Sequence, residues 1–325
     1  MGLSRRKISV IVPTYDRPVM FRQAIASIRA LEAEGDDIEF EIIVGDNGLK
    51  NETLQTCKEL GAIYVPAPGK GSSYGRNAAM KVATGEFIAF LDDDDVWLSG
   101  CMRPHVAFLD ANPHLDAVFG QAIYADPDLK PLGPPWPAEH PGEGDAMMKT
   151  MLSGLFPQVG TFLARMKVVE QVGYFDTHLV GGQDLDWLMR LSRQRKLGFV
   201  PVPCILFRGR PARSYDALQR KRIGFDRHVF LRHGLPEAHR LWTGPLDFMR
   251  SYHGTLRHYY LYFIDKANWF VENGQRGEAV KALVTPMINL PLLAIADLVR
   301  PSELRTAIGN VMRGRLKQPL TAEAT

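Results

Sequence analysis

Four consecutive carboxylates, Asp92 to Asp95, directly follow the apolar segment 87–91 in "FIAFLDDDDVW". Two unit charges about 4 Å apart repel by about 1 kcal/mol in water and by about 4 kcal/mol at the effective dielectric of a protein surface. Such a run therefore needs exposure to solvent, raised pKa values or a bound cation. A solvated acidic loop is the ordinary alternative, but a buried strand before the run would hold the carboxylates in one fixed place.

Two other strand-like segments also end in polar residues, "PTYD" at Pro13 to Asp16 and "GDNG" at Gly45 to Gly48. Ligands of an open parallel sheet bind beyond the carboxyl ends of the strands. Asp16 and Asp46 could hydrogen-bond a base or a sugar there, and the following helix N-termini could face phosphate. A divalent ion bridging a diphosphate would suit the carboxylates, since magnesium is typically held by one or two carboxylates plus substrate phosphates.

The segments that must position these residues alternate between strand and helix. The spacing of Phe21, Ile25, Ile28 and Leu31 predicts a helix over 18–32. Continuous apolar runs in the strands indicate an α/β fold with a mostly parallel sheet covered on both faces. The expected strands in this part are 7–15, 39–46, 62–68 and 86–91, and the other expected helices are 52–60 and 74–85.

The pattern continues with a helix at 101–113, strands at 115–125 and 156–166, a helix at 181–195 and a strand at 197–207. Between them, residues 126–144 form a loop rich in proline and glycine, in which Trp136 either contacts substrate or packs the loop onto the body. From about residue 213 the segments 215–234, 255–274 and 277–299 all look helical. We expect an α/β domain over 1–235 and a helical region over 236–325.

Composition narrows the class of protein. A formal net charge of +3 is too mild to argue for nucleic acid. Three cysteines without metal-ligand spacing indicate reduced thiols in a cytoplasmic protein. The apolar N-terminal stretch is too short for a signal peptide and contains Pro13. The longest uncharged run, 282–296, has 15 residues where a spanning helix needs about 20.

Four motifs in order carry a resemblance to a known family: "ISVIVPTYDRP", "IIVGDNGLKNET", "GRNAAMKVATGEFIAFLDDDD" and "GYFDTHLVGGQDLDWLMRL". Over about residues 7–215 the chain resembles the family 2 glycosyltransferases with the GT-A fold. The resemblance implies inverting transfer of a sugar from a nucleotide diphosphate, with UDP expected, to an acceptor hydroxyl, with Mn²⁺ or Mg²⁺ as cofactor. The Q-x-x-R-W motif and transmembrane helices of the processive synthases are absent, so a single-addition enzyme is expected.

The resemblance also implies roles for individual residues. Asp94 falls on the metal-ligand position, Asp93 on the ribose side, and Asp92 is a helper, while Asp95 is expected to cap the following turn. Arg208, Arg210 and Arg213 stand where the family often has a histidine near the diphosphate. The residues matched to nucleotide contacts are Pro13, Thr14, Tyr15, Asp16, Asp46, Arg76, Asp92 and Asp93.

The segment "GGQDLDW" matches the one that supplies the catalytic base, with Gln183 replacing the usual Glu. On a helix, Asp184 and Asp186 are about 200° apart and cannot share a face. Asp186 precedes Arg190 by four residues, the arrangement of an exposed helix ion pair. Asp184 lies at the helix start after two glycines and shares a face with Trp187, so we expect Asp184 to be the base.

Other readings stay open. A nucleotidyltransferase shares the sheet, but "PTYDRP" lacks the glycine-rich arginine loop of that class; a non-catalytic nucleotide-sugar-binding homologue is the non-enzymatic alternative. The expected partners are a nucleotide-sugar donor and a sugar, lipid-linked or other hydroxyl acceptor, with no nucleic acid, and homo-oligomerisation stays open. Segment 282–315 combines an apolar stretch with basic residues, and the basic residues of this end of the chain are Arg300, Arg305, Arg313, Arg315 and Lys317. This end either docks on the anionic inner face of a membrane or is a solvated basic end of an ordinary helical region.

Overall fold

The computed structural model describes residues 5–35, 37–179, 181–194, 196–209, 216–299 and 302–314. Within this part of the chain, eight strands form one sheet in the order β3-β2-β1-β4-β7-β6-β8-β5. The strands are β1 (Arg6–Thr14), β2 (Ile38–Asp46), β3 (Ile63–Pro66), β4 (Phe87–Phe90), β5 (Val96–Trp97), β6 (Ala117–Ala125), β7 (Phe162–Arg165) and β8 (Leu197–Arg208).

The sheet is mostly parallel, as the sequence predicted. Strands β3, β2, β1 and β4 run parallel, and so do β6 and β8. The short strand β7 is antiparallel to both of its neighbours, β4 and β6, and β5 is antiparallel to β8. Strand β5 was not expected, because its two residues are too few to give a pattern.

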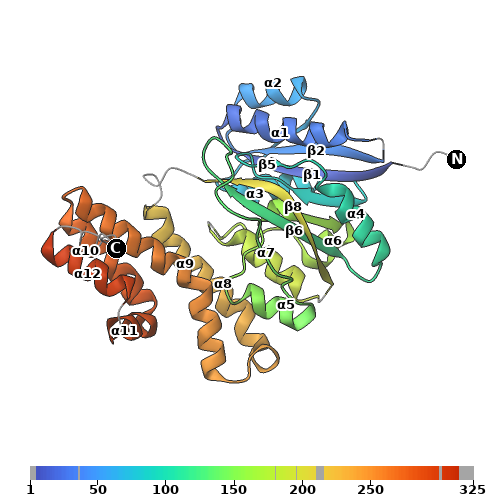
Figure 1. Cartoon of the computed structure of the whole chain (residues 1–325). Helices are drawn as coiled ribbons and strands as arrows, with labels where there is room; N and C mark the ends of the chain where they lie inside the picture. The colour runs from blue at the N-terminus through green and yellow to red at the C-terminus, as the bar shows by residue number, and fades with distance from the viewer. Residues whose placement is uncertain are drawn as a thin grey trace, which may run out of the picture.

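Helices cover both faces of the sheet (Figure 1). Val10 and Val12 of β1 pack in one core cluster with α1 and α4, whereas Ile11 packs in another with α3, α5 and α7. Apolar residues at successive positions are therefore all buried, which explains the continuous apolar runs. The helices of this part are α1 (Pro18–Glu32), α2 (Asn51–Glu59), α3 (Ser72–Met80), α4 (Met102–Ala111), α5 (Gly144–Met151), α6 (Lys167–Val172) and α7 (Gln183–Ser192).

Some boundaries differ from the sequence expectation. Helix α3 ends at Met80 rather than at residue 85. Helices α5 and α6 were not expected, since both are short and lie beside predicted loops or strands. The loop 126–144 is held to β6 by Trp136, whose backbone exchanges hydrogen bonds of 2.8 and 2.9 Å with Ala122 and whose ring lies 6.2 Å from that of Phe207. Trp136 therefore packs the loop onto the body of the domain, which was one of the two roles expected for it.

The C-terminal part is helical and lies beside the sheet domain (Figure 1). It has its own core cluster, centred on Tyr260 and Phe263 of α9. Val229 and Phe230 of α8 instead join the core of the sheet domain. Residue 235, the predicted domain boundary, lies inside α8, and that boundary stays a prediction. The helices are α8 (Asp216–Leu241), α9 (Pro245–Glu272), α10 (Arg276–Asn289), α11 (Pro291–Val299) and α12 (Glu303–Arg313).

The apolar stretch predicted as one helix over 277–299 is two helices. Helices α10 and α11 meet at Leu290 with a bend of 112°, where Pro291 cannot continue the hydrogen-bond ladder of α10. Among the described residues no single helix is long and apolar enough to cross a membrane. The bent pair of α10 and α11 reaches that length and apolar composition only when the two helices are taken together.

Candidate functional site

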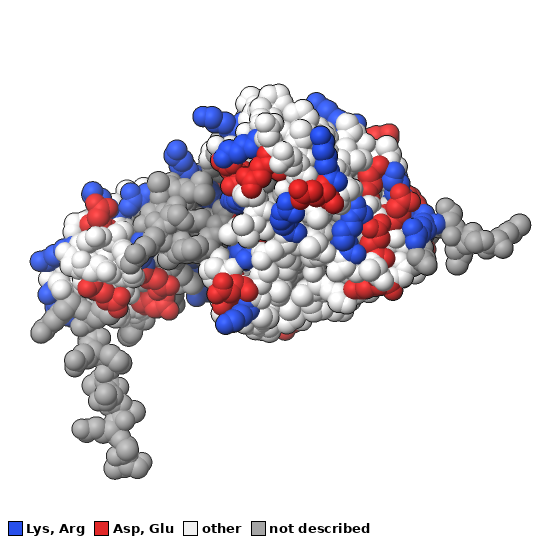
Figure 2. Space-filling model, turned by 90° about the horizontal axis from the view of Figure 1, so that it is seen from above, with Lys and Arg blue, Asp and Glu red and all other residues white. Residues whose placement is uncertain are grey.

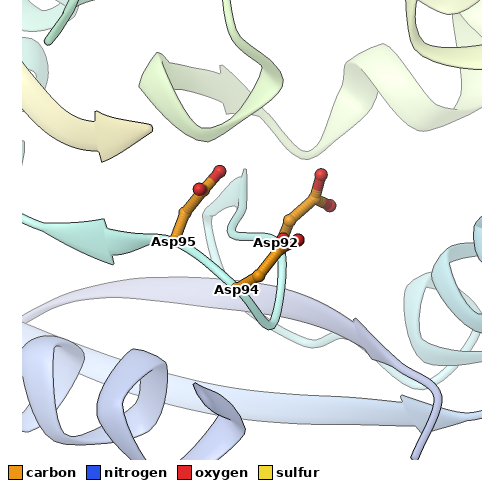
Figure 3. A group of neighbouring side chains, drawn as sticks. All are labelled: Asp92, Asp94 and Asp95. Carbon is orange, nitrogen blue, oxygen red and sulfur yellow. The ribbon is translucent and has the colours of Figure 1, made fainter. Parts of the chain in front are cut away.

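The acid run forms the turn between β4 and β5. The N–H of Leu91 donates to the carbonyl of Ile11 (3.0 Å), so the run begins where the paired strand ends. Carboxylate oxygens of Asp92, Asp94 and Asp95 all lie within 4.8 Å of one another, and the three side chains leave the turn on the same side (Figure 3). Carboxylate oxygens are the ligands that Mg²⁺ and Ca²⁺ prefer, so this cluster could hold a metal ion.

Two arginines offset the repulsion within the run. Arg76 Nη2 lies 2.5 Å from Asp92 Oδ1, and Arg17 Nη1 lies 2.8 Å from both Asp93 Oδ1 and Asp94 Oδ2. Sequence reasoning missed Arg17, although it directly follows the motif "PTYD". Its role depends on how the β1 loop folds over the acidic turn, which no local pattern encodes.

Asp93 faces β1 and is not one of the three clustered carboxylates. The hydroxyl of Thr14 donates to its Oδ2 (2.8 Å), and the backbone N–H of Tyr15 donates to the same oxygen (3.3 Å). Burial raises the pKa of Asp93 to about 6, against the opposing effect of Arg17 and with a further increase from Asp94. Asp93 therefore joins the β1 loop to the acidic turn.

Arg76 reaches Asp92 from α3 and is only 1% exposed. Its guanidinium lies over the ring of Phe175 at 5.1 Å, and its Nε has no hydrogen-bond partner among the described residues. Helix α3 packs unusually close to β2, since a Cβ on Gly45 would lie 2.0 Å from the carbonyl oxygen of Gly75. This glycine contact lets Arg76 reach the sheet edge.

The other residues matched to nucleotide contacts gather beside the turn, at the ends of β1 and β2. Pro13 and Thr14 stand opposite Gly45 and Asp46 in the register of the two strands. The fully buried Asp46 accepts hydrogen bonds from the N–H of Gly48 (2.8 Å) and the hydroxyl of Tyr64 (3.2 Å).

Asp16 lies next to them and has a left-handed backbone (φ 61°), and its carboxylate pairs with Lys50. A Cβ on Gly48 would come within 3.5 Å of the Asp16 nitrogen. Tyr15 is 64% exposed and so presents its ring to solvent. The structure thus brings together at one edge all the residues that the sequence matched to the nucleotide.

A cavity of about 550 Å³ runs from this turn to the C-terminal helices. Trp136 is not among its lining residues. The residues that line the cavity come mainly from the acidic turn, the start of α7, the end of β8, and helices α8 and α9. They include Asp92, Asp94, Tyr124, Phe156, Gln158, Gly182, Gln183, Asp184, Leu188, Phe207, Arg208, Arg222, Asp226, His258, Tyr259 and Tyr262.

Asp184 lines this cavity at the start of α7. The helix begins after Gly182, which has a left-handed backbone (φ 66°) that glycine adopts without strain. The neighbouring Gln183 donates from Nε2 to the hydroxyl of Ser72 (2.9 Å), so it ties the segment to α3. Trp187 is fully buried and stacks on Phe175 at 5.3 Å, so it belongs to the core.

Asp186 lies in the opposite environment. The predicted ion pair with Arg190 exists (3.0 Å), but the expectation of an exposed pair is wrong, because Asp186 is fully buried. Helix α8 covers it and supplies His233 (2.9 Å) and Arg232 (3.2 Å). Burial acts to raise the pKa of Asp186, but the hydrogen bond with His233 and the charges of both arginines outweigh it, so the pKa is lowered.

Arg208 fastens the end of β8 to the acidic turn. Its backbone N–H donates to Asp95 Oδ1 (2.8 Å), and its Nε donates to the carbonyl of Asp94 (2.7 Å). The other guanidinium nitrogens donate to Gln23 Oε1 (2.6 Å) and to the carbonyl of Pro127 (2.5 Å). The carboxylate of Asp95 therefore accepts a hydrogen bond from the backbone of β8. Arg210 and Arg213 lie outside the described residues.

The far wall of the cavity was missed by sequence reasoning. The hydroxyl of Tyr259 donates to Asp226 Oδ2 (2.6 Å), and burial raises the pKa of Asp226 to about 6 against the effect of this hydrogen bond. The segment "HYYLYF" of α9, residues 258–263, contributes to the core of the helical part. Tyr260 and Phe263 belong to that core alone, whereas Tyr259 and Tyr262 pack in or against it and also line the cavity.

Comparison with solved structures identifies the fold. Residues 1–349 of Staphylococcus aureus TarS in complex with UDP-GlcNAc superpose with a TM-score of 0.58 at 21% identity, covering 95% of this chain and 89% of that one. The mannosyltransferase PcManGT from Pyrobaculum calidifontis, in complex with GDP-Man and Mn²⁺, gives 0.53 at 19% identity, covering 95% and 86%. At these identities the likeness establishes the GT-A fold.

Sequence comparison identifies the family. The chain is 34% identical over 124 residues to the GalNAc(5)-diNAcBac-PP-undecaprenol beta-1,3-glucosyltransferase of Campylobacter jejuni, a match that spans 36% of this chain and only 38% of that protein. The model of glycosyl transferase family 2 matches residues 9–173, just over half of the chain. This protein is therefore a member of glycosyl transferase family 2, as the order of its motifs indicated.

Proposed function

We propose that this protein is a non-processive, inverting glycosyltransferase that moves a sugar from a nucleotide diphosphate, with UDP as the expected nucleotide, to an acceptor hydroxyl. The observation that carries the proposal is the shared cavity, which is lined by Asp184 as well as by Asp92 and Asp94. Inversion requires a group that takes the acceptor proton opposite the leaving diphosphate. Asp184 is the carboxylate of α7 that reaches the cavity, whereas Asp186 is enclosed by basic side chains.

The donor side of the proposal rests on the edge formed by β1, β2 and the acidic turn. Asp46 and Asp16 would contact the nucleotide there, with Asp93 on the ribose side. Arg76 holds Asp92 in place, and Arg208 holds the backbone of Asp94. These contacts fix the turn before any donor arrives, which lowers the entropic cost of binding.

Metal dependence is part of the proposal. The hard oxygen ligands of Asp92, Asp94 and Asp95 suit Mn²⁺ or Mg²⁺, and the Mn²⁺ in the PcManGT complex supports this choice. When bound, the ion would stabilise the negative charge that develops on the leaving diphosphate.

For location, the proposal is peripheral contact with the anionic inner face of a membrane, which would suit a lipid-linked acceptor like that in the name of the Campylobacter relative. Exposed Arg305 and Arg313 on α12 could meet anionic headgroups; Arg300, Arg315 and Lys317 lie outside the described residues. The adjacent helices α10 and α11 expose large apolar side chains, namely Val280, Val284, Ile288, Leu292, Ile295, Leu298 and Val299.

Flotation with phosphatidylglycerol vesicles tests this location. Co-flotation should occur with the anionic vesicles and weaken in Ile288→Ser combined with Leu292→Ser. Leu246→Ser is the matched control, because Leu246 is 77% exposed on α9, outside the apolar surface of α10 and α11. Absence of co-flotation in the unaltered protein contradicts membrane contact.

A thermal-shift panel of UDP, GDP, CDP and dTDP, each with and without Mn²⁺, tests the function itself. UDP with Mn²⁺ should stabilise the protein, since a ligand at 100 times its Kd contributes about 2.7 kcal/mol. Asp94→Asn should abolish the metal-dependent part, while Asp128→Asn, an exposed aspartate of the loop 126–144, should not.

The panel also separates the alternatives. UDP stabilisation in Asp94→Asn that still depends on Mn²⁺ rules out the metal assignment. A protein that binds UDP but releases none from any UDP-sugar is a non-catalytic homologue. Pyrophosphate release from a nucleoside triphosphate and a sugar phosphate would identify a nucleotidyltransferase.

A further inference from the structure

The cavity has two chemically different ends. One end is the acidic turn, and the other is built by α8 and α9 of the C-terminal part, from residues to which the family motifs do not extend. The ends meet at the start of α7, because a Cβ on Gly182 would lie 2.7 Å from Asp226 Oδ1. Asp184, two residues further on, is near enough for its charge to act on Asp226. A group held by α8 and α9 would therefore lie next to the proposed base.

Among the residues that the structure describes, the charges at this second end do not favour an anion. Its charged lining residues within the described chain are Asp184, Asp226 and Arg222, so one guanidinium faces two carboxylates. Arg208 is fastened to the acidic turn, where its guanidinium stands with those of Arg17 and Arg76 against four carboxylates, so its positive charge is balanced at that end of the cavity. A phosphate or carboxylate group placed here would meet carboxylate repulsion that a single arginine offsets only in part.

The same end is rich in aromatic side chains. Tyr259 and Tyr262 from α9 and Phe156 from the segment before β7 line it, and the ring of Phe156 packs edge-on against His258 at 5.6 Å. Aromatic rings offer flat apolar faces, and tyrosine adds a hydroxyl for hydrogen bonding. The Tyr259 hydroxyl holds Asp226 Oδ2, which fixes the orientation of that carboxylate. Apolar faces combined with an oriented carboxylate suit a molecule that has both C–H faces and several hydroxyl donors.

We infer that α8 and α9 form the acceptor subsite of this enzyme and that the subsite takes an uncharged polyhydroxylated acceptor, a sugar ring or a polyol, and not a group phosphorylated beside the reacting hydroxyl. The inference rests on the proposed glycosyltransferase function and adds the class of acceptor. Asp226 accepts hydrogen bonds from acceptor hydroxyls, the rings of Tyr262 and Phe156 pack against its apolar faces, and Asp184 stands beside the hydroxyl that reacts.

Saturation-transfer NMR on the full chain with UDP and Mn²⁺ tests this inference. The probes are the methyl glycosides of glucose, galactose and N-acetylglucosamine, ribitol, and ribitol 5-phosphate. At least one neutral probe should receive saturation from the unaltered protein, and ribitol should exceed its phosphate. Tyr262→Ala and Asp226→Asn should reduce the signal of the bound neutral probe about fivefold, the scale of one lost aromatic or hydrogen-bond contact.

The control variant is Tyr174→Ala, which removes a tyrosine that is 42% exposed and does not line the cavity. The thermal shift with UDP and Mn²⁺ is recorded for every variant, and it should stay unchanged in all three. Asp226→Asn changes a buried group, so the half-buried Tyr262 supplies the second variant if the first fails to fold.

The outcomes separate this inference from the function on which it rests. Loss of the UDP shift in the unaltered protein contradicts the glycosyltransferase proposal itself. A normal UDP shift with no signal from any neutral probe, or with unchanged signals in both variants, overturns the acceptor subsite. Stronger saturation of ribitol 5-phosphate than of ribitol overturns the charge argument and assigns the subsite to an anionic acceptor.

Discussion

The two ends of the cavity hold their carboxylates in different ways. At the edge of the sheet, Asp92 pairs with Arg76, and Asp94 pairs with Arg17, both within 2.8 Å. At the helical end, Asp226 is held by the neutral hydroxyl of Tyr259. Charge-assisted pairs suit a place where ionic ligands and a cation meet, whereas a neutral donor leaves the carboxylate available to neutral hydroxyls. This difference agrees with the proposal that the sheet edge binds the charged donor and the helices bind an uncharged acceptor.

The same contrast recurs within α7, between two aspartates that are two residues apart. Asp184 faces the cavity, and Asp186 faces the core with three basic partners from α7 and α8. Under the proposed function, one helix thus carries one carboxylate for chemistry and another for structure. Identical substitutions at the two positions should therefore affect different properties.

The largest effect is expected for Asp184→Asn, which removes the proposed base and keeps its shape. Turnover should fall about 10²-fold or more, the usual scale of general-base catalysis, while the thermal shift with UDP and Mn²⁺ is retained. The measurement is UDP release from UDP-sugars in the presence of an acceptor panel. Asp128→Asn is the control, and unaltered turnover in Asp184→Asn contradicts the assignment of the base.

An effect on stability, with turnover of the folded protein much less affected, is expected for Asp186→Asn. An exposed ion pair, as the sequence suggested for Asp186, would contribute little, but Asp186 is buried beneath Arg190, Arg232 and His233. Removing one partner of a buried charge network costs about 3–5 kcal/mol. Urea denaturation should show this loss for Asp186→Asn and little change for Asp184→Asn. Equal stability of the two variants would mean that α8 does not cover α7 as described.

The smallest effect concerns the pH dependence of stability. The pKa of Asp226 is raised from 3.8 to about 6 by burial, so the folded state binds more protons than the unfolded state between these values. The contribution of Asp226 to stability is therefore fully present below about pH 4 and is lost as pH rises to about 6. Asp226→Asn removes this dependence.

Relative to the unaltered protein, Asp226→Asn should gain about 2 kcal/mol between pH 4 and pH 7, at 1.36 kcal/mol for each unit of pKa shift. Urea denaturation at pH 4, 5, 6 and 7 measures the difference, with the exposed Asp128→Asn as control. A difference that does not change with pH would mean that Asp226 is charged throughout, and the helical end would then carry a full extra negative charge.

The parts of the site that local sequence encodes could be predicted, and the parts that long-range packing creates could not. Apolar strands followed by polar residues predicted that Asp16, Asp46 and the acidic run gather at one edge, and the structure brings them together. The contacts of Arg17 with Asp93 and Asp94, and of Asp95 with the backbone of Arg208, depend on the folded geometry of the turns and could not be predicted. The burial of Asp186 depends on His233, 47 residues away, on a helix whose docking leaves no periodic signal in α7.

The fold shows the same division. The mostly parallel sheet could be predicted from the order of strands and helices, since each strand and each helix has a pattern in its own local sequence. The antiparallel β7 and the pairing of β5 with β8 did not, because both join segments that are distant in sequence. The break at Pro291 had a local signal, but the apolar run on both sides of it resembled one continuous helix.

The contact of Asp186 with His233 and Arg232 has a practical consequence for recombining members of this family. Exchanging the C-terminal helices between relatives is an obvious way to transfer acceptor preference from one enzyme to another. A graft joined before α8 would separate Asp186 from both partners and leave a buried charge without compensation. A graft joined after residue 233 keeps the α7–α8 lock from the recipient and imports α9 with its tyrosines, so hybrids with that junction should be the ones that fold.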